Sequence, residues 1–174
     1  MNEGIHGSHA LWLEVVNRII GDGPRDTLLD VCCGGCAVTR HLAFATKAGV
    51  DVWDHPERPT DVLFHKQDAW AFLNDRWDDR GQFDVAIISD GLEHFNKSQG
   101  MLVRCAMRRI ANLSIIFVPT GDEVLVTPES TDPHSHKSSW TAASFRDMGY
   151  TVEEYPSWHG EGRGALFTWI KEAA

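Results

Sequence analysis

Short apolar runs alternate with segments of helical periodicity along most of this 174-residue chain. An amphipathic helix is predicted from a cap at Ser8 to about Ile20, with Gly21 as its stop. Apolar runs with the length of buried strands lie at 27–32, 50–53, 62–65, 83–89 and 113–118. Helices are predicted at 36–45, 69–77, 98–111 and 141–148. This alternation is typical of a doubly wound, mainly parallel α/β sheet.

The end of the chain departs from the alternation. Strands predicted at 150–155 and 165–171 are joined only by the Gly-rich turn 160–164, so we expect them to form an antiparallel hairpin. Earlier in the chain, Pro56 and Pro59 argue against a full helix between the second and third strands. A long polar segment, 120–139, follows the fifth strand, and such long loops are usually functional or disordered.

Length, charge and cysteine content limit the classes of partner, the location and the metal content that we expect. The length predicts a single domain over residues 1–174, and 16 basic against 25 acidic residues give a net charge of −9, which argues against nucleic acid as substrate. No signal-peptide pattern is visible at 1–7, and no apolar run approaches the roughly 20 residues that span a bilayer, so we expect a cytoplasmic protein. Because zinc needs about four ligands and no second Cys pair exists, we expect Cys32, Cys33 and Cys36 to be reduced and to hold no metal.

Acidic residues lie at or near four strand ends, where open α/β sheets bind ligands. Asp51 lies 51 − 30 = 21 residues after Asp30, the spacing at which an acid accepts both hydroxyls of a ribose. Asp68 could accept an adenine amine, with the Ala69 N–H offered to the ring. Asp90 or Ser89 could receive an ammonium group.

The turn after the first strand and four histidines complete the candidate chemistry. Small residues at Gly34 and Gly35 let the backbone turn sharply beside a ligand, and the next helix is expected to point its free N–H groups there. A histidine can remove a proton from an oxygen or nitrogen acceptor at neutral pH. The first candidate is His94, after the fourth strand, and the second is His136. Further candidates, with less support, are His134 and His159, and His9 is placed where it could contact a cofactor.

Four segments in order resemble motifs of class I S-adenosylmethionine (SAM) methyltransferases. They are Asp30-Val31-Cys32-Cys33-Gly34, Gly49-Val50-Asp51-Val52, Asp90-Gly91-Leu92-Glu93-His94 and, as in a bacterial subgroup, His136-Lys137-Ser138-Ser139-Trp140-Thr141. The resemblance implies the strand order 3-2-1-4-5-7-6 and SAM as cofactor, with S-adenosylhomocysteine (SAH) as product. It implies cofactor contacts from His9, Asp30, Cys32, Gly34, Gly35, Asp51, Val52, Asp68, Ala69, Ser89 and Asp90. It also implies methyl transfer to an oxygen or nitrogen of a small molecule or exposed group, with His94 and His136 as catalytic candidates.

The chain departs from the family pattern in two places, which keeps an alternative open. Cys32 and Cys36 replace glycines of the first motif, which could weaken cofactor binding, and the proline-bearing link 54–61 leaves little room for the usual helix. The chain also lacks an inserted domain that would cap a substrate. The site is therefore an open cleft, or a partner chain or a second copy completes it. The alternatives are a degenerate SAM-binding subunit that acts through a protein partner, and a nicotinamide-dependent oxidoreductase, which the terminal hairpin and the 90–94 segment disfavour.

Overall fold

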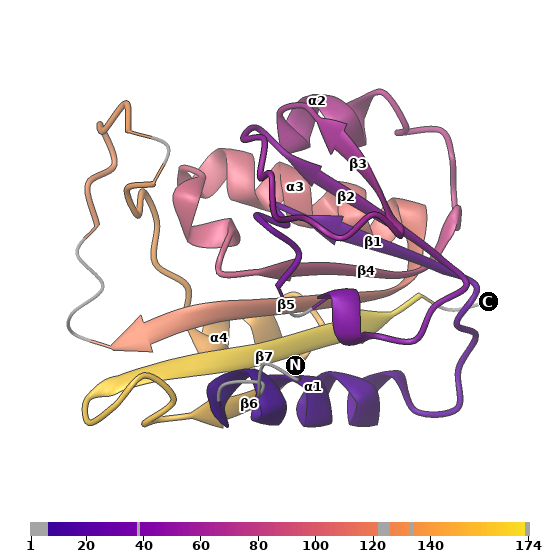
Figure 1. Cartoon of the computed structure of the whole chain (residues 1–174). Coiled ribbons are helices and arrows are strands. Elements are labelled where there is room, and N and C mark those ends of the chain that lie inside the picture. Colours follow the sequence, from indigo (N-terminus) through magenta and orange to yellow (C-terminus); the bar gives the residue numbers. More distant parts are fainter. Residues whose placement is uncertain (1–6, 38, 122–125, 133, 173–174) are drawn as a thin grey trace.

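A seven-stranded sheet in the order β3-β2-β1-β4-β5-β7-β6 forms the centre of the molecule (Figure 1). The computed structural model describes residues 7–37, 39–121, 126–132 and 134–172. The strands are β1 (Thr27–Val31), β2 (Thr46–Asp51), β3 (Val62–Lys66), β4 (Phe83–Ser89), β5 (Ala111–Gly121), β6 (Thr151–Tyr155) and β7 (Arg163–Lys171). All neighbours are parallel except β7, which pairs antiparallel with both β5 and β6. The predicted topology and hairpin are confirmed.

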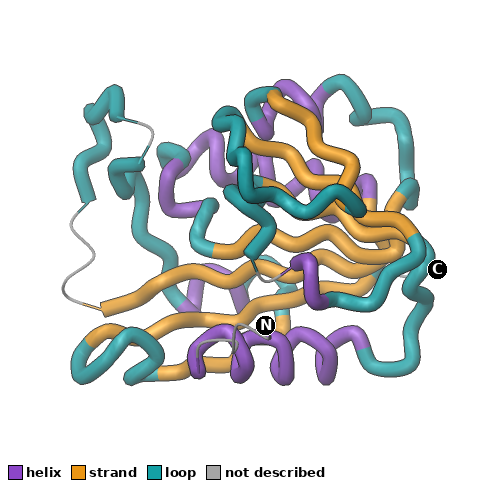
Figure 2. Tube along the Cα trace, viewed as in Figure 1, coloured by secondary structure: helices purple, strands orange, loops and turns teal. Residues whose placement is uncertain are grey.

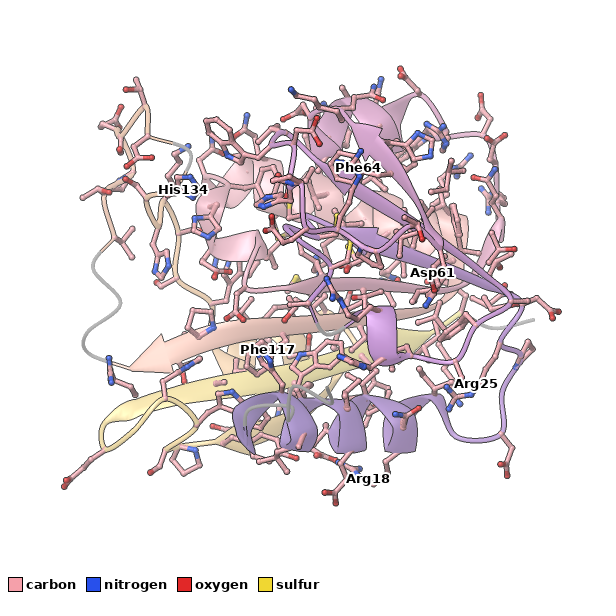
Figure 3. All side chains as sticks on the ribbon, viewed as in Figure 1. Arg18, Arg25, Asp61, Phe64, Phe117 and His134 are labelled. Carbon is pink, nitrogen blue, oxygen red and sulfur yellow. The ribbon has the colours of Figure 1, made fainter. Side chains whose placement is uncertain are left out.

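Helices cover the two faces of this sheet unequally. The helical elements are α1 (Gly7–Ile20), η1 (Thr39–His41), α2 (Ala69–Asn74), η2 (Leu92–His94), α3 (Lys97–Ile110) and α4 (Ala142–Arg146). Residues of α2, α3 and α4 share one buried apolar cluster, and residues of α1 belong to the other. Figure 1 accordingly shows α1 on the side of the sheet opposite to α2, α3 and α4, and Figure 3 shows Phe117 of β5 between the sheet and α1.

The alternation of side chains along β4 divides the two cores. Ile88 belongs to the cluster under α2, α3 and α4, whereas its neighbour Ile87 belongs to the cluster under α1, and both are fully buried. Successive side chains of a strand point to opposite faces, so a continuous apolar run such as 83–89 is what a strand covered on both faces requires. Because both faces are covered, a ligand of the central strands must bind at the strand ends.

The predicted helix at 36–45 is wrong, since the described residues of this range (36–37 and 39–45) form only the short η1. Cys36 has a left-handed backbone, with φ of 56°, which no helix can continue through. The buried Thr39 turns its hydroxyl onto the Asp30 carboxyl. Leu42 packs in the core under α1, and β2 begins at Thr46, four residues before its predicted start at Val50. The β2 strand therefore takes residues that periodicity assigned to a helix or turn.

Two further boundaries differ from prediction. Ser8 lies inside α1, which begins at Gly7, so its predicted role as cap is wrong. The strand β5 runs three residues beyond the predicted 118, to Gly121. The absence of a helix at 52–61 among the described residues agrees with the effect expected of the prolines. Beyond β5, the segment up to α4 is loop throughout its described residues, and residues 122–125 and 133 lie outside them (Figure 2).

Candidate functional site

A cavity of about 410 Å³ lies at the carboxyl ends of the central parallel strands. We call it the cofactor cavity. Its lining comes from the end of β2, from segments that follow β1, β2, β3 and β4, including residues of α2, η2 and α3, and from the long loop: Cys32, Gly34, Asp51, Val52, Trp53, His55, Asp68, Ala69, Trp70, Asp90, His94, Phe95, Gln99, His134 and Lys137. Seven of the predicted cofactor contacts are in this set: Cys32, Gly34, Asp51, Val52, Asp68, Ala69 and Asp90.

The turn after β1 has a glycine-like backbone at three residues, although two of these three are cysteines. Cys32 and Cys36 have φ of 57° and 56°, and Gly34 between them has φ of 50°. These values lie in the left-handed region, which costs a residue with a Cβ roughly 1–2 kcal/mol. The turn therefore holds a left-handed backbone at two residues that carry a side chain, and Cys32 lines the cofactor cavity.

Asp51 links the β1 turn to the end of β2. Its Oδ2 accepts a hydrogen bond from the Gly34 N–H at 2.9 Å, and its Oδ1 accepts one from the Trp53 N–H at 2.9 Å. These two bonds hold the carboxylate in place. Each carboxylate oxygen has a second lone pair, so Asp51 can still accept hydroxyl protons from a ligand in the cavity.

Asp68 is positioned by the helix that follows it. Its Oδ1 accepts the Ala71 N–H at 2.9 Å and caps α2, which leaves Oδ2 to face the cavity. Ala69 is the first residue of that helix, where a backbone N–H has no partner inside the helix. A carboxylate oxygen and a free N–H at adjacent residues match the donor and acceptor pattern along an adenine edge.

Asp30 supports the turn from below. It is buried, it does not line the cofactor cavity, and the Thr39 hydroxyl donates to its Oδ2. Burial raises the pKa of the Asp30 carboxyl to about 7, and the Thr39 hydrogen bond only partly offsets this effect. This placement supports a structural role, and a direct cofactor contact from Asp30 stays a prediction.

A second cavity, of about 320 Å³, adjoins the first. We call it the acceptor cavity. It is lined by Asp90, Glu93, His94, Pro119, Thr120, His136, His159 and Arg163. Asp90 and His94 line both cavities, so these two residues form the junction between them. Asp90 has φ of 49°, a left-handed backbone, and desolvation raises the pKa of its carboxyl to about 6.

The long loop places two histidines on different cavities. The His134 ring stacks on Trp53, with centroids 5.6 Å apart and planes 10° from parallel. The His136 ring meets His94 edge-on at 5.1 Å. Burial and the nearby His94 ring lower the pKa of His136, while burial raises the pKa of Glu93 to about 8. The two predicted catalytic histidines are thus brought together, 42 residues apart in sequence, at one wall of the acceptor cavity.

Some predicted residues lie elsewhere, and some lining residues were not predicted. Like Asp30, the residues His9, Gly35 and Ser89 are outside the lining of both cavities, and their cofactor contacts stay predictions. The additional lining residues of the cofactor cavity include Trp53, His55, Trp70, Phe95, Gln99 and Lys137. Trp53 directly follows the second motif, so an exposed aromatic at that position was an available signal. Lys137 lies in the fourth segment that resembles the family, but only the path of the loop shows that it reaches this cavity.

A larger hollow, of about 990 Å³, lies away from these strand ends, along the β2–β3 edge. Pro56, Pro59 and Phe64 line it, together with the ion pair between Lys47 and Asp61 at 2.7 Å. The loop 52–61 takes the place of a helix there, which leaves this side of the edge open. Both of its cations are already paired, Lys47 with Asp61 and Arg58 with Asp54. The lining of the hollow includes no residue of β1 or β4, so we assign the functional site to the two smaller cavities.

The fold is that of class I SAM-dependent methyltransferases. The N-methyltransferase NodS from Bradyrhizobium japonicum superposes with a TM-score of 0.64 at 13% identity, over 97% of this chain and 98% of that one. The CurJ carbon methyltransferase gives 0.63 at 10% identity, over 94% and 54% of the chains. A complex of DhpI with SAH gives 0.62 at 19% identity, over 95% and 86%. No protein-family model matches the sequence, and no curated protein sequence matches it significantly.

Among the described residues no helix has the length and apolar character needed to cross a membrane.

Proposed function

We propose that this protein is a SAM-dependent methyltransferase that acts on an oxygen or nitrogen acceptor. The observation that carries the proposal is the junction at Asp90 and His94, because methyl transfer needs a cofactor site and an acceptor site in direct contact. SAM would lie in the cofactor cavity with its ribose on Asp51 and its adenine at Asp68 and Ala69. Its ammonium group would point to Asp90. The SAH complex of DhpI, which has the same fold, supports this choice of cofactor.

The charges of the cofactor cavity suit a cationic ligand. Asp51, Asp68 and Asp90 contribute carboxylates, and SAM carries a positive ammonium and a positive sulfonium group. Methyl transfer from a sulfonium is an in-line displacement, so positioning the acceptor supplies much of the rate. An acceptor that carries a proton must also lose it, and His94 at the junction is placed to receive that proton.

The acceptor cavity sets the kind of substrate. Its volume of about 320 Å³ fits a small molecule or one exposed group of a larger one. The two transferases named for an N-acceptor and a carbon acceptor share this fold at 10–13% identity, so the fold does not select the acceptor atom. The choice of oxygen or nitrogen rests on the histidines, which are useful where a proton must be removed.

A second candidate function is a SAM-binding subunit that acts through a partner protein. The observation in its favour is Cys32, whose side chain enters the cofactor cavity where the family has a glycine. A side chain at this position would suit a site that binds SAM but transfers its methyl group only when a partner protein is present. A second copy of the chain could serve as that partner.

Calorimetry with SAM, SAH and NAD separates the cofactor classes. We expect SAM and SAH to bind with one site per chain and NAD to give no heat of binding. Binding of NAD without SAM would overturn the proposal. Transfer of a labelled methyl group from SAM to a panel of small acceptors, with the chain alone, then separates an active enzyme from a subunit. Transfer only after a partner protein is added would favour the second candidate.

A further inference from the structure

Three metal-binding side chains converge on one wall of the acceptor cavity. Glu93 and His94 come from η2, and His136 comes from the long loop. One ligand atom from each residue lies within 4.8 Å of the other two. Asp90 and Thr120 lie on the same cavity, so the cluster faces a space that can admit a ligand.

Glu93 has an oxygen with no protein partner. The residue is 2% exposed, and its buried Oε2 makes no hydrogen bond with any described residue. Its Oε1 lies 3.9 Å from the His94 Nε2, too far for a hydrogen bond. Buried carboxylates are normally hydrogen-bonded, paired with a charge or coordinated to a metal. The unpartnered oxygen therefore points to a ligand at this position.

The orientation of His94 suits coordination. Its Nδ1 lies 3.3 Å from the carbonyl oxygen of Ser135, and a carbonyl oxygen can only accept. The proton of a neutral ring is therefore on Nδ1, and Nε2 presents its lone pair towards Glu93. Metal-bound histidines are usually held in this way, with the second nitrogen donating to a backbone carbonyl.

The backbone holds the third side chain close to the other two. The N–H groups of Lys137 and Ser138 donate to the carbonyl oxygen of Glu93 at 2.7 and 3.1 Å. These bonds connect the two loop residues that follow His136 to Glu93, which directly precedes His94. Ligands about 2.0–2.2 Å from an ion lie roughly 3–3.5 Å apart, so a closure of about 1 Å would complete the geometry.

We propose that Glu93, His94 and His136 bind a divalent transition-metal ion. Two imidazoles and one carboxylate suit zinc, manganese, cobalt or iron(II), whereas magnesium and calcium prefer oxygen ligands alone. Three protein ligands leave at least one coordination position free, and the acceptor cavity lies on that side. The cysteines, on which the expectation of no metal rested, take no part.

The ion would change the role of the two histidines. As ligands they would not act as general bases, and the ion itself would lower the pKa of an acceptor oxygen bound at the open position. This role in catalysis rests on the proposed function, whereas the binding of the ion does not. An oxygen acceptor is then favoured over a nitrogen acceptor, since an oxygen that loses its proton is the better ligand for such an ion.

Metal titration of the full chain, stripped by a chelator and then dialysed, tests the site. We expect Co²⁺ and Zn²⁺ to bind with one ion per chain by calorimetry, and bound Co²⁺ to show the weak visible absorption of nitrogen and oxygen ligands. His136→Ala should lower the affinity at least about 100-fold, and Glu93→Gln should do the same if the variant folds. His41→Ala, at an exposed histidine outside both cavities, is the matched control and should bind metal as the parent does.

Three results would overturn the site. They are no binding to the stripped parent, unchanged affinity in a folded His136→Ala, or an intense thiolate-to-cobalt band that places the ion on the cysteine turn. SAM binding, measured separately by calorimetry on the same samples, distinguishes the two proposals. If the chain binds SAM but no metal ion, only the metal site is refuted. If the chain binds a metal ion but no SAM, only the proposed function is refuted.

Discussion

The two halves of the site are built by different means. In the cofactor half, the side chains sit at strand ends and are held by nearby backbone groups, as Asp51 is by Trp53 and Asp68 is by Ala71. In the acceptor half, His94 and Glu93 are held by residues more than 40 positions away, through Ser135, Lys137 and Ser138. In the first half the acidic side chains are set by the sheet, and the loop adds only His134 and Lys137, whereas the second half exists only when the loop is docked.

Because of this difference, the two halves can meet different functional requirements. A site built on strand ends is rigid before a ligand arrives, which lowers the cost of binding a cofactor. A site closed by a loop can vary its substrate without changing the fold, because loops tolerate change better than strands do. The comparison predicts that cofactor affinity and turnover respond to substitutions in different halves.

The largest expected effect is on the pH dependence of stability, and it concerns the buried Asp30 next to the cofactor half. The pKa of Asp30 is raised to about 7 in the folded chain. A raised folded-state pKa stabilises the protein below the unfolded pKa, and this stabilisation is lost as the pH rises through 7. Between pH 4.5 and 7.5 the parent should therefore lose about 3 kcal/mol of stability that Asp30→Asn does not lose. Urea unfolding across this range measures the difference, with the exposed Asp78→Asn as control. Parallel pH profiles for parent and Asp30→Asn would show that the buried carboxyl carries no such penalty.

The second effect is on turnover in the acceptor half. His94→Ala should lower methyl transfer about 10²-fold or more, whether the ring acts as base or as ligand, and should leave SAM affinity nearly intact. Labelled SAM and the acceptor found in the panel give the rate, and calorimetry gives the affinity. The exposed His41→Ala, outside both cavities, is the control. Should SAM affinity and turnover fall together, His94 belongs to the cofactor half.

The third effect is on affinity in the cofactor half. Asp51→Ala removes the acceptor of the ribose hydroxyls, and each charge-assisted hydrogen bond is worth roughly 1.5–3 kcal/mol. SAM affinity should fall at least about tenfold by calorimetry. Asp54→Ala, three residues further on and outside the cofactor cavity, should leave it unchanged. A folded Asp51→Ala with the affinity of the parent would contradict the ribose assignment.

The smallest effect concerns the strained turn. Cys32→Gly and Cys32→Ala both remove the thiol, but only glycine relieves the left-handed backbone, so the glycine variant should be more stable by about 1 kcal/mol. At the exposed Cys105 inside α3 the order should reverse, because glycine destabilises a helix by about 1 kcal/mol relative to alanine. Chemical unfolding of the four variants measures both differences. Equal stabilities of the two Cys32 variants would show that the turn stores no strain.

Local pattern was sufficient for the sheet and for much of the cofactor half. The run 83–89 matches β4 residue for residue, and spacing was enough to propose Asp51, which lines the cofactor cavity. Local pattern failed at 36–45, where Cys36 takes a conformation unusual for a cysteine and Thr39 bonds to a buried acid. It also missed the convergence of Glu93 with His136, since that depends on hydrogen bonds between segments far apart in the chain. Periodicity reports which face of an element is buried, but not where a long loop returns.

Because β7 lies between β5 and β6, the sheet cannot be completed during synthesis until β7 has left the ribosome. The strand β7 leaves the ribosome after both of its neighbours, and it carries Arg163, part of the acceptor cavity. Until it inserts, a nascent chain has β5 as an open sheet edge, with an apolar face not yet covered by Phe167. The cofactor half can form on a partly synthesised chain, whereas the acceptor half waits for the last strand. A stalled or truncated product would thus be prone to aggregation before it could be active.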